Sequence, residues 1–158
     1  MENGLVSGIA FQKDQMKYTL HGVSDTPGIA YSILGPLSDA NIEVDVIVQN
    51  ISVDGKTDFT FTVSKEDEHA TSEVIKQMKN SLDFDDVIVD SQIAKVSLVG
   101  VGMRTHAGIA STAFKALSEN DVNIQMISTS EIKITIVINE SAVTKAVKAL
   151  HEAFELEK

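Results

Sequence analysis

An internal repeat constrains the fold of this 158-residue chain more than any other feature. Gly28-Ile29-Ala30 aligns with Gly108-Ile109-Ala110, and the same offset aligns residues 40–47 with 120–127, apolar position on apolar position. A longer turn in the first copy, at 53–56, then shifts the alignment, so that residues 57–63 match 132–138. The length allows one ordinary domain or two small ones, and the repeat favours two.

Both copies show the same order of predicted elements, namely strand, helix, strand, strand and helix. The pair Asp54-Gly55 indicates a hairpin turn, and Ser64 and Asn139 are candidate N-caps for the last helices. The predicted strands are 17–22, 42–51 and 58–63 in the first copy and 95–102, 122–128 and 133–138 in the second. The predicted helices are 28–39 and 66–80, then 108–119 and 141–154.

A sixth element is present in the first copy, as a strand at 86–90, whereas the second copy reaches Lys158 without one. A spare strand-like segment at 5–11 precedes the first copy. Because an unpaired sheet edge is a liability, we expect this segment to complete the second copy. The predicted units are residues 15–92 and residues 1–14 plus 93–158, with 91–94 as the junction. The predicted fold class is α+β, with two ferredoxin-like βαββαβ units, antiparallel sheets and helices on one face.

The composition excludes several classes of function. A formal net charge of −10 disfavours nucleic-acid and membrane partners. The absence of Cys excludes disulfides, thiolate metal sites and Cys nucleophiles. Aromatic residues make up 5% of the chain and Trp is absent, so we expect a core of Val, Ile, Leu and Ala. No signal peptide and no long apolar run are present, and we expect a cytoplasmic protein.

Both copies place a Gly, Gly28 or Gly108, where the first helix begins. A helix start offers unpaired N–H groups and the positive end of the helix dipole, and Gly lets a ligand approach the backbone. The natural guest is an anion such as the carboxylate of an amino acid. The two Gly residues could instead only shape the turn. Because two such loops occur at equivalent places, we favour binding.

The second strands carry polar residues among their apolar ones. A solvated sheet face explains some of them, while others could hold an ammonium group or a hydroxyl beside the Gly loop. The candidates are Glu43, Asp45, Gln49 and Glu131.

No catalytic or metal-binding motif is found. The His residues are scattered; His69 and His151 are expected in solvent and His106 in a structural role. The acids 83, 85 and 86 are interpreted as a solvated connection. Gly100-Val101-Gly102 lacks the third Gly of a dinucleotide-binding loop, because position 105 is Thr105.

Four runs together resemble the paired ACT domains at the C-terminus of aspartokinase, over essentially the whole chain. These runs are Val23-Ser24-Asp25-Thr26-Pro27-Gly28, Val48-Gln49-Asn50-Ile51-Ser52, Ile127-Ser128-Thr129-Ser130-Glu131-Ile132 and the start of the second unit at 96–103. Aspartokinases phosphorylate the side-chain carboxylate of aspartate on the route to lysine, threonine and methionine. Their ACT domains bind threonine or lysine and inhibit the kinase.

The resemblance implies a regulatory chain without catalytic residues, metal or cofactor of its own. Its expected partners are threonine and/or lysine, a second copy paired through the ACT units, and a catalytic α subunit that uses ATP and Mg. The chain is similar to a separate β subunit or to an excised regulatory fragment, because the Lys-Phe-Gly-Gly type motif of the kinase domain is absent.

The resemblance also places the effector-binding residues, at seams between paired ACT units. One set is Asp25, Gly28, Ile29, Ala30, Glu43, Val44, Asp45 and Gln49; the other is Ile109, Ala110, Asn123, Ile124, Ser130 and Glu131. His106-Ala107 departs from the Pro that often precedes the Gly, so the resemblance is weaker at the second set. The alternatives are an ACT-type sensor of another biosynthetic enzyme, a nucleic-acid-binding ferredoxin-like domain, and an enzyme with its own site.

Overall fold

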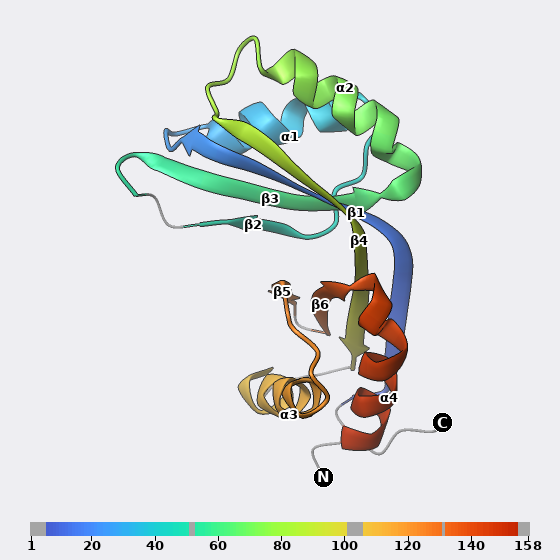
Figure 1. Cartoon of the computed structure of the whole chain (residues 1–158). Helices are drawn as coiled ribbons and strands as arrows, with labels where there is room; N and C mark the ends of the chain where they lie inside the picture. Colours follow the sequence, from blue (N-terminus) through green and yellow to red (C-terminus); the bar gives the residue numbers. More distant parts are fainter. Residues whose placement is uncertain (1–5, 51–52, 101–105, 131, 155–158) are drawn as a thin grey trace. The chain divides into compact units, whose positions relative to one another are not determined.

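The structure is a computed structural model, and it describes residues 6–50, 53–100, 106–130 and 132–154 (Figure 1). The predicted features at Leu5, 51–52, 101–105 and Glu131 lie outside these residues, as does the side chain of His106. The elements in chain order are β1 (Gly8–Ser24), α1 (Ile29–Asp39), β2 (Ile47–Gln49), β3 (Lys56–Ser64), η2 (Lys65–Asp67), α2 (Glu68–Met78), β4 (Asp86–Val99), α3 (His106–Glu119), β5 (Met126–Thr129), β6 (Lys133–Asn139), η3 (Glu140–Ala142) and α4 (Val143–Ala153).

The chain forms two compact units. The first unit is Asp14–Ser91, and the second unit is Met1–Lys13 together with Gln92–Lys158. The strand order β2-β3-β1-β4-β6-β5 gives each unit four neighbouring strands, because β1 and β4 contribute to both. The pairings β1/β3, β2/β3, β4/β6 and β5/β6 are all antiparallel. This is the predicted α+β, ferredoxin-like fold class.

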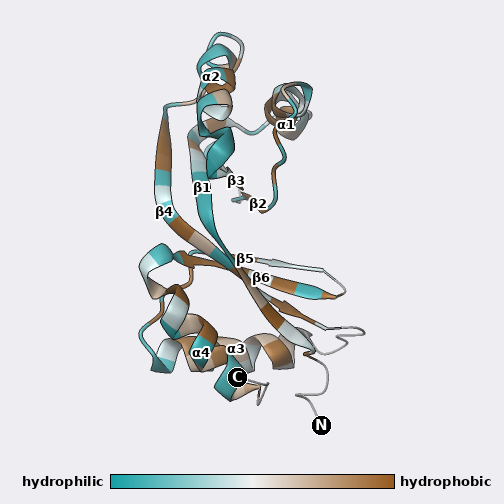
Figure 2. Cartoon of the chain, turned by 90° about the vertical axis from the view of Figure 1, so that its right-hand side faces the viewer, coloured by the Kyte–Doolittle hydropathy of each residue, from teal (hydrophilic) through white to brown (hydrophobic). Residues whose placement is uncertain are grey.

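The helices of each unit lie on one face of its strands. Figure 1 shows α1 and α2 together over the strands of the first unit. Figure 2 shows α3 and α4 together in the second unit, with apolar colour along the neighbouring strands. Among the described residues, no helix has the length and apolar character needed to cross a bilayer.

Two predicted strand breaks are wrong. Segments 5–11 and 17–22 belong, in the described part, to the single strand β1, and 86–90 and 95–102 likewise to β4. The predicted junction at 91–94 therefore lies inside a strand. Neither Gly nor Pro interrupts β4, so nothing forces the backbone to turn between the units. Asp14, with φ 59°, marks the point where β1 passes from one unit to the other.

Other element boundaries also differ from the predictions. The second strand of each copy is shorter than predicted. β2 begins at Ile47 instead of residue 42, and β5 begins at Met126 instead of residue 122. Each last helix begins with a 3-10 turn. Asn139 caps one of these turns, accepting a hydrogen bond from the Ser141 amide at 2.9 Å, whereas Ser64 makes no side-chain cap.

The two copies share backbone details beyond their elements. After α1 and α3 the chain passes through a left-handed residue, Asn41 (φ 60°) or Asp121 (φ 57°). The next amide then bonds back into the helix, from Ile42 to the Leu37 carbonyl at 3.0 Å and from Val122 to the Leu117 carbonyl at 2.9 Å. This is the ordinary left-handed end of a helix. This helix end directs the backbone of both copies toward the sheet in the same way.

Each unit has its own apolar core. The second unit packs mainly Val, Ile, Leu and Ala, as the composition predicts. The first unit adds an aromatic cluster: Tyr18 stacks on Phe61 with ring centroids 5.6 Å apart, and Phe59 lies 6.4 Å from Phe61. The first core contains these aromatic residues beside its Val, Ile and Leu residues, so the expectation of a purely aliphatic core is incomplete there.

The hairpin turn at Asp54-Gly55 is confirmed. Both residues have positive φ (56° and 76°), and the Val53 and Lys56 amides each bond the other's carbonyl, at 2.8 and 3.0 Å. We predict that Gly55→Ala lowers the free energy of unfolding by about 1 kcal/mol, because a Cβ is disfavoured in the left-handed region. The measurement is urea unfolding. Gly8→Ala is the control, since Gly8 has no positive φ and open space around it; equal losses in both variants would refute the turn geometry.

Tyr18 generates a pH prediction. Its ring is buried and its hydroxyl donates to the Glu68 carbonyl at 3.3 Å. Burial raises the pKa of Tyr18, a hydrogen bond with Ser72 lowers it, and the Glu68 carboxylate raises it, with a net upward shift. The unfolded state therefore ionises first as pH rises through about 10, and stability falls there by at most about 1.4 kcal/mol per pH unit. Urea unfolding of Tyr18→Phe from pH 8 to 11 should show a weaker decline.

Candidate functional site

The corner between β1 and α1 is fixed by its own backbone. The Asp25 amide donates to the Gly55 carbonyl at 2.8 Å, which ties the corner to the β2–β3 hairpin turn. Within the corner, the Ile29 amide donates to the Thr26 carbonyl at 3.1 Å. Gly28 is the N-cap of α1 with φ 88°, a conformation that favours Gly.

The N-terminus of α1 is open to a ligand. Gly28 makes no side-chain cap, and no acidic residue occupies the first turn. The Ser32 hydroxyl bonds back to the Gly28 carbonyl at 3.1 Å, so it does not reach the free amides. A Cβ built on Gly28 would meet nothing within 4 Å. The positive end of the helix is therefore available to an anion.

Two of the predicted effector-binding residues meet at this corner. The Gln49 side-chain amide, from β2, donates to an Asp25 carboxylate oxygen at 3.5 Å, and both residues are exposed. Glu43 and Asp45 are exposed on the segment between α1 and β2, where the Asp45 amide donates to the Thr62 carbonyl at 3.0 Å.

The apolar members of the first set belong to the core rather than to a polar pocket. Ile29 is buried, and Ala30 and Val44 pack against the core of the first unit. These three residues can offer a ligand their backbone, but their side chains are engaged in packing.

The second corner repeats this arrangement in its described part. The Thr112 hydroxyl bonds the Gly108 carbonyl at 3.1 Å, as Ser32 does with Gly28. Ile109 is buried, and Ala110 and Ile124 pack against the core of the second unit. Asn123 and Ser130 are exposed, and the Ser130 amide donates to the Lys133 carbonyl at 2.7 Å.

A strand bulge just before the first corner is absent from the sequence predictions. The β1/β3 register shifts between Leu20 and Val23, and Gly22 there has φ 72°. One Asp58 carboxylate oxygen accepts from the Gly22 amide at 3.2 Å and lies 2.8 Å from His21 Nδ1. Bulges bend a strand and redirect the chain beyond them, so this one directs the corner. The nearest sequence signal is Gly22 itself.

Asp85 is more than part of a solvated connection, because it covers the bulge. Its amide donates to the His21 carbonyl at 2.8 Å, and its carboxylate lies 3.7 Å from Lys56 Nζ. A Cβ on Gly22 would come within 2.3 Å of the carboxylate. Together with the bulge these residues line a polar hollow of about 310 Å³. In the described part of the chain, no three His, Asp or Glu side chains are placed to bind one metal ion.

The predictions for the helical His residues have different outcomes. His69 is exposed, as predicted. The prediction for His151 is wrong: the residue is partly buried, and its Nδ1 is inaccessible and has no hydrogen-bond partner among the described residues.

Comparison with known families defines the class of protein first. Residues 19–83 and residues 96–154 each match an ACT-domain model, so the chain is a tandem of two ACT domains. An aspartate kinase from Pseudomonas fluorescens is 55% identical over 157 residues, which are 99% of this chain and 38% of that protein. The chain thus spans little more than a third of that relative.

Two solved regulatory chains match over nearly their whole length. One chain in a crystal structure of aspartokinase alpha and beta subunits is 48% identical, with a TM-score of 0.89, covering 96% of this chain and 99% of that one. The ligand-free regulatory subunit of aspartate kinase from Thermus thermophilus is 32% identical, also with a TM-score of 0.89, covering 95% and 99%. This chain belongs to the aspartokinase family and corresponds to its regulatory part.

The bulge generates a stability prediction. Asp58→Ala leaves the buried Gly22 amide without its acceptor, which should lower the free energy of unfolding by about 1–3 kcal/mol. Asp83→Ala removes an exposed acid from the connection that leads to Asp85 and should change stability by less than about 0.5 kcal/mol. Urea unfolding measures both; a neutral Asp58→Ala would show that water replaces the carboxylate.

Proposed function

We propose that this chain binds threonine, lysine or both as end-product effectors, and so inhibits an aspartate kinase of which it is the regulatory part. The catalytic α subunit or domain would use ATP and Mg to phosphorylate aspartate, and the assembly would be cytoplasmic. The observation that carries the proposal is the uncapped start of α1 beside the Asp25–Gln49 pair. Membership of the aspartokinase family supports the pathway.

The corner offers a free amino acid complementary groups. Its carboxylate would accept hydrogen bonds from the Ala30 and Tyr31 amides in the first turn of α1, where Gly28 leaves the backbone accessible. Its ammonium group would pair with the Asp25 carboxylate. Gln49, which bonds Asp25, would contact the effector's side chain. A threonine hydroxyl bonded there would disfavour valine, which leaves the site's polar partner unpaired.

We infer that effector binds where ACT units of two copies pair. The strands β2 and β5 lie at the two ends of the strand order, so each has an edge that can pair with another strand. Ile47 on β2 and Ile127 on β5 occupy equivalent positions, and both are exposed apolar residues. Tyr31, in the first turns of α1, is 79% exposed. Large exposed apolar side chains beside the corner suit a surface that a second copy covers.

Pairing provides a route to regulation. An effector that binds the paired state more tightly shifts the equilibrium by its differential affinity for that state. A kinase attached to these units would then respond to effector concentration without any contact between effector and catalytic residues.

A thermal-shift experiment on the full chain tests the proposal. At about 100 times its dissociation constant, an effector adds about 2.7 kcal/mol to stability, which raises the Tm by about 5–10 °C for a chain of this size. Threonine and lysine are the probes, separately and together, and valine tests the hydroxyl. No change in Tm with either probe, at up to about 10 mM, would contradict the proposal.

The Gly28→Ala variant tests whether the effector binds at the start of α1. The new Cβ points into the space that the effector would occupy, so we expect the Tm increase to shrink by at least half. Gly8→Ala is the control, because it also adds a Cβ in open space but lies away from the corner; each variant's response is measured from its own unliganded Tm. A full effector response in Gly28→Ala would place the site elsewhere.

A further inference from the structure

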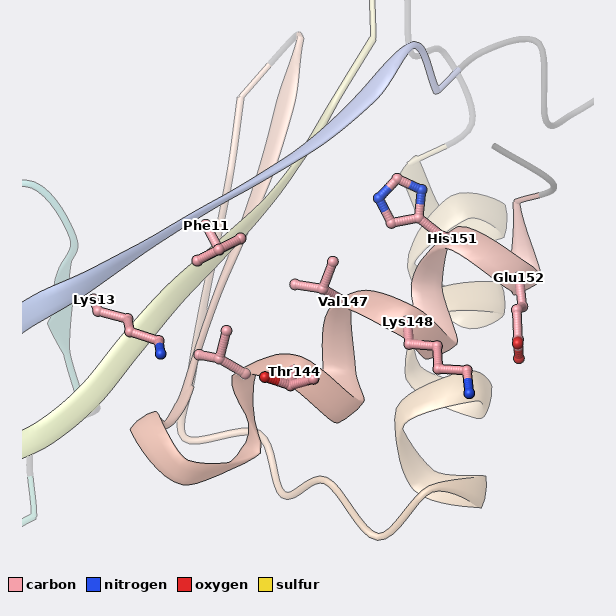
Figure 3. A pocket seen from close by; sticks show the side chains of 8 residues that line it. Phe11, Lys13, Thr144, Val147, Lys148, His151 and Glu152 are labelled. Atoms are coloured by element: carbon pink, nitrogen blue, oxygen red, sulfur yellow. The ribbon is translucent and has the colours of Figure 1, made fainter. Parts of the chain in front are cut away.

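The second unit contains a groove between β1 and α4, with a volume of about 610 Å³. Its walls include Phe11 and Lys13 from β1, and Val143, Val147, Lys148 and His151 from α4. Figure 3 shows Val147 and His151 projecting from α4 toward β1, with Phe11 opposite them. The volume is in the range of small-molecule sites, and the groove includes none of the predicted effector-binding residues.

The duplicated fold provides an internal comparison for the helix wall. Residue by residue, α4 (Val143–Ala153) aligns with α2 (Glu68–Met78), and both follow a 3-10 turn. Where α4 presents Val143, Val147 and His151, α2 presents Glu68, Ser72 and Lys76, all exposed. The ferredoxin-like unit therefore folds with polar residues at these three positions. The apolar helix wall has no counterpart in α2; within the second unit, Val143 and Val147 also pack in the core.

The side chains around the groove favour an anion. The ionisable side chains that line the groove include Lys148, which is exposed, in a chain whose net charge is −10. His151 Nδ1 is buried without a partner among the described residues. A proton on Nε2 avoids burying an unpaired N–H. In that tautomer Nε2 is a donor, on a residue that lines the groove.

We propose that this groove binds a small carboxylate with an aromatic or branched-chain body. The body would lie against Phe11 and Val147. Phe11 is 50% exposed in the free chain, and covering it and Val147 removes apolar surface from water. The carboxylate would accept a hydrogen bond from His151 Nε2 and pair with Lys148. This site is distinct from the helix corners and would regulate the same chain through a second class of ligand.

NMR titration of the ¹⁵N-labelled chain with 3-phenylpropionate tests the proposal. We expect saturable amide shifts in residues 9–13 and 143–152, with a dissociation constant of about 1 mM, as befits a ligand of this size. Phenethylamine has the same ring with an opposite charge and should bind at least about tenfold more weakly. No saturable shift in these residues at 10 mM, or equal binding of the amine, would overturn the proposal.

Variants separate the groove from nonspecific binding. Val147→Ser introduces the residue found at the equivalent place in α2, and should weaken 3-phenylpropionate about tenfold. Lys148→Ala should also weaken it, whereas Lys145→Ala, an exposed Lys on the same helix outside the groove, should not. Unchanged affinity in both groove variants would overturn the proposal. Sedimentation of the unliganded chain, with and without Val147→Ser, is a further test. If the substitution dissociates a dimer, the groove binds a second copy of the chain and the proposal is overturned.

Discussion

The pairing of β1 with β4 is the interaction on which both units depend. These two strands are neighbours in the sheet order, and each contributes to both units. Hydrogen bonds near their ends, from the Ser7 amide to the Val99 carbonyl at 2.7 Å and from the Asp85 amide to the His21 carbonyl at 2.8 Å, mark the extent of the contact. In the first unit β1 is the first strand and β4 the last. In the second unit these roles are exchanged, so neither unit has a complete sheet without both strands.

The corner before α1 gains its shape from three left-handed glycines. Gly22 forms the bulge, Gly28 begins the helix and Gly55 closes the hairpin whose carbonyl accepts from Asp25. Asp58 holds the bulge, and Asp85 lies against it. A helix start is useful for binding an anion when nothing in the protein already occupies it. Here backbone and buried contacts position the corner, and no side chain caps the start of α1.

The repeat was sufficient to predict the fold class and the order of helices and strands within each copy, and turn chemistry predicted the Asp54-Gly55 hairpin; the position of Asp25 near Gln49 came from the resemblance to aspartokinase. Strand continuity was missed at residues 90–92, where a polar run, Asp90-Ser91-Gln92, resembles a loop although no Gly or Pro breaks it. The bulge was missed because it depends on the register between β1 and β3. His151 was placed in solvent because helical spacing does not show that Phe11, from the opposite end of the chain, faces it.

The interleaved arrangement of the two units sets an order of assembly during translation. The first unit, Asp14–Ser91, is contiguous in the chain, so the ribosome delivers all of it before α3 or α4 exists. Protein domains generally fold as they emerge, N-terminal first. Residues 8–13 are then joined to a folded first unit, and they lack their pairing partner until the part of β4 beyond Ser91 has been synthesised. Residues 8–13, already joined to the first unit through β1, are then the strand that the continuing β4 pairs with.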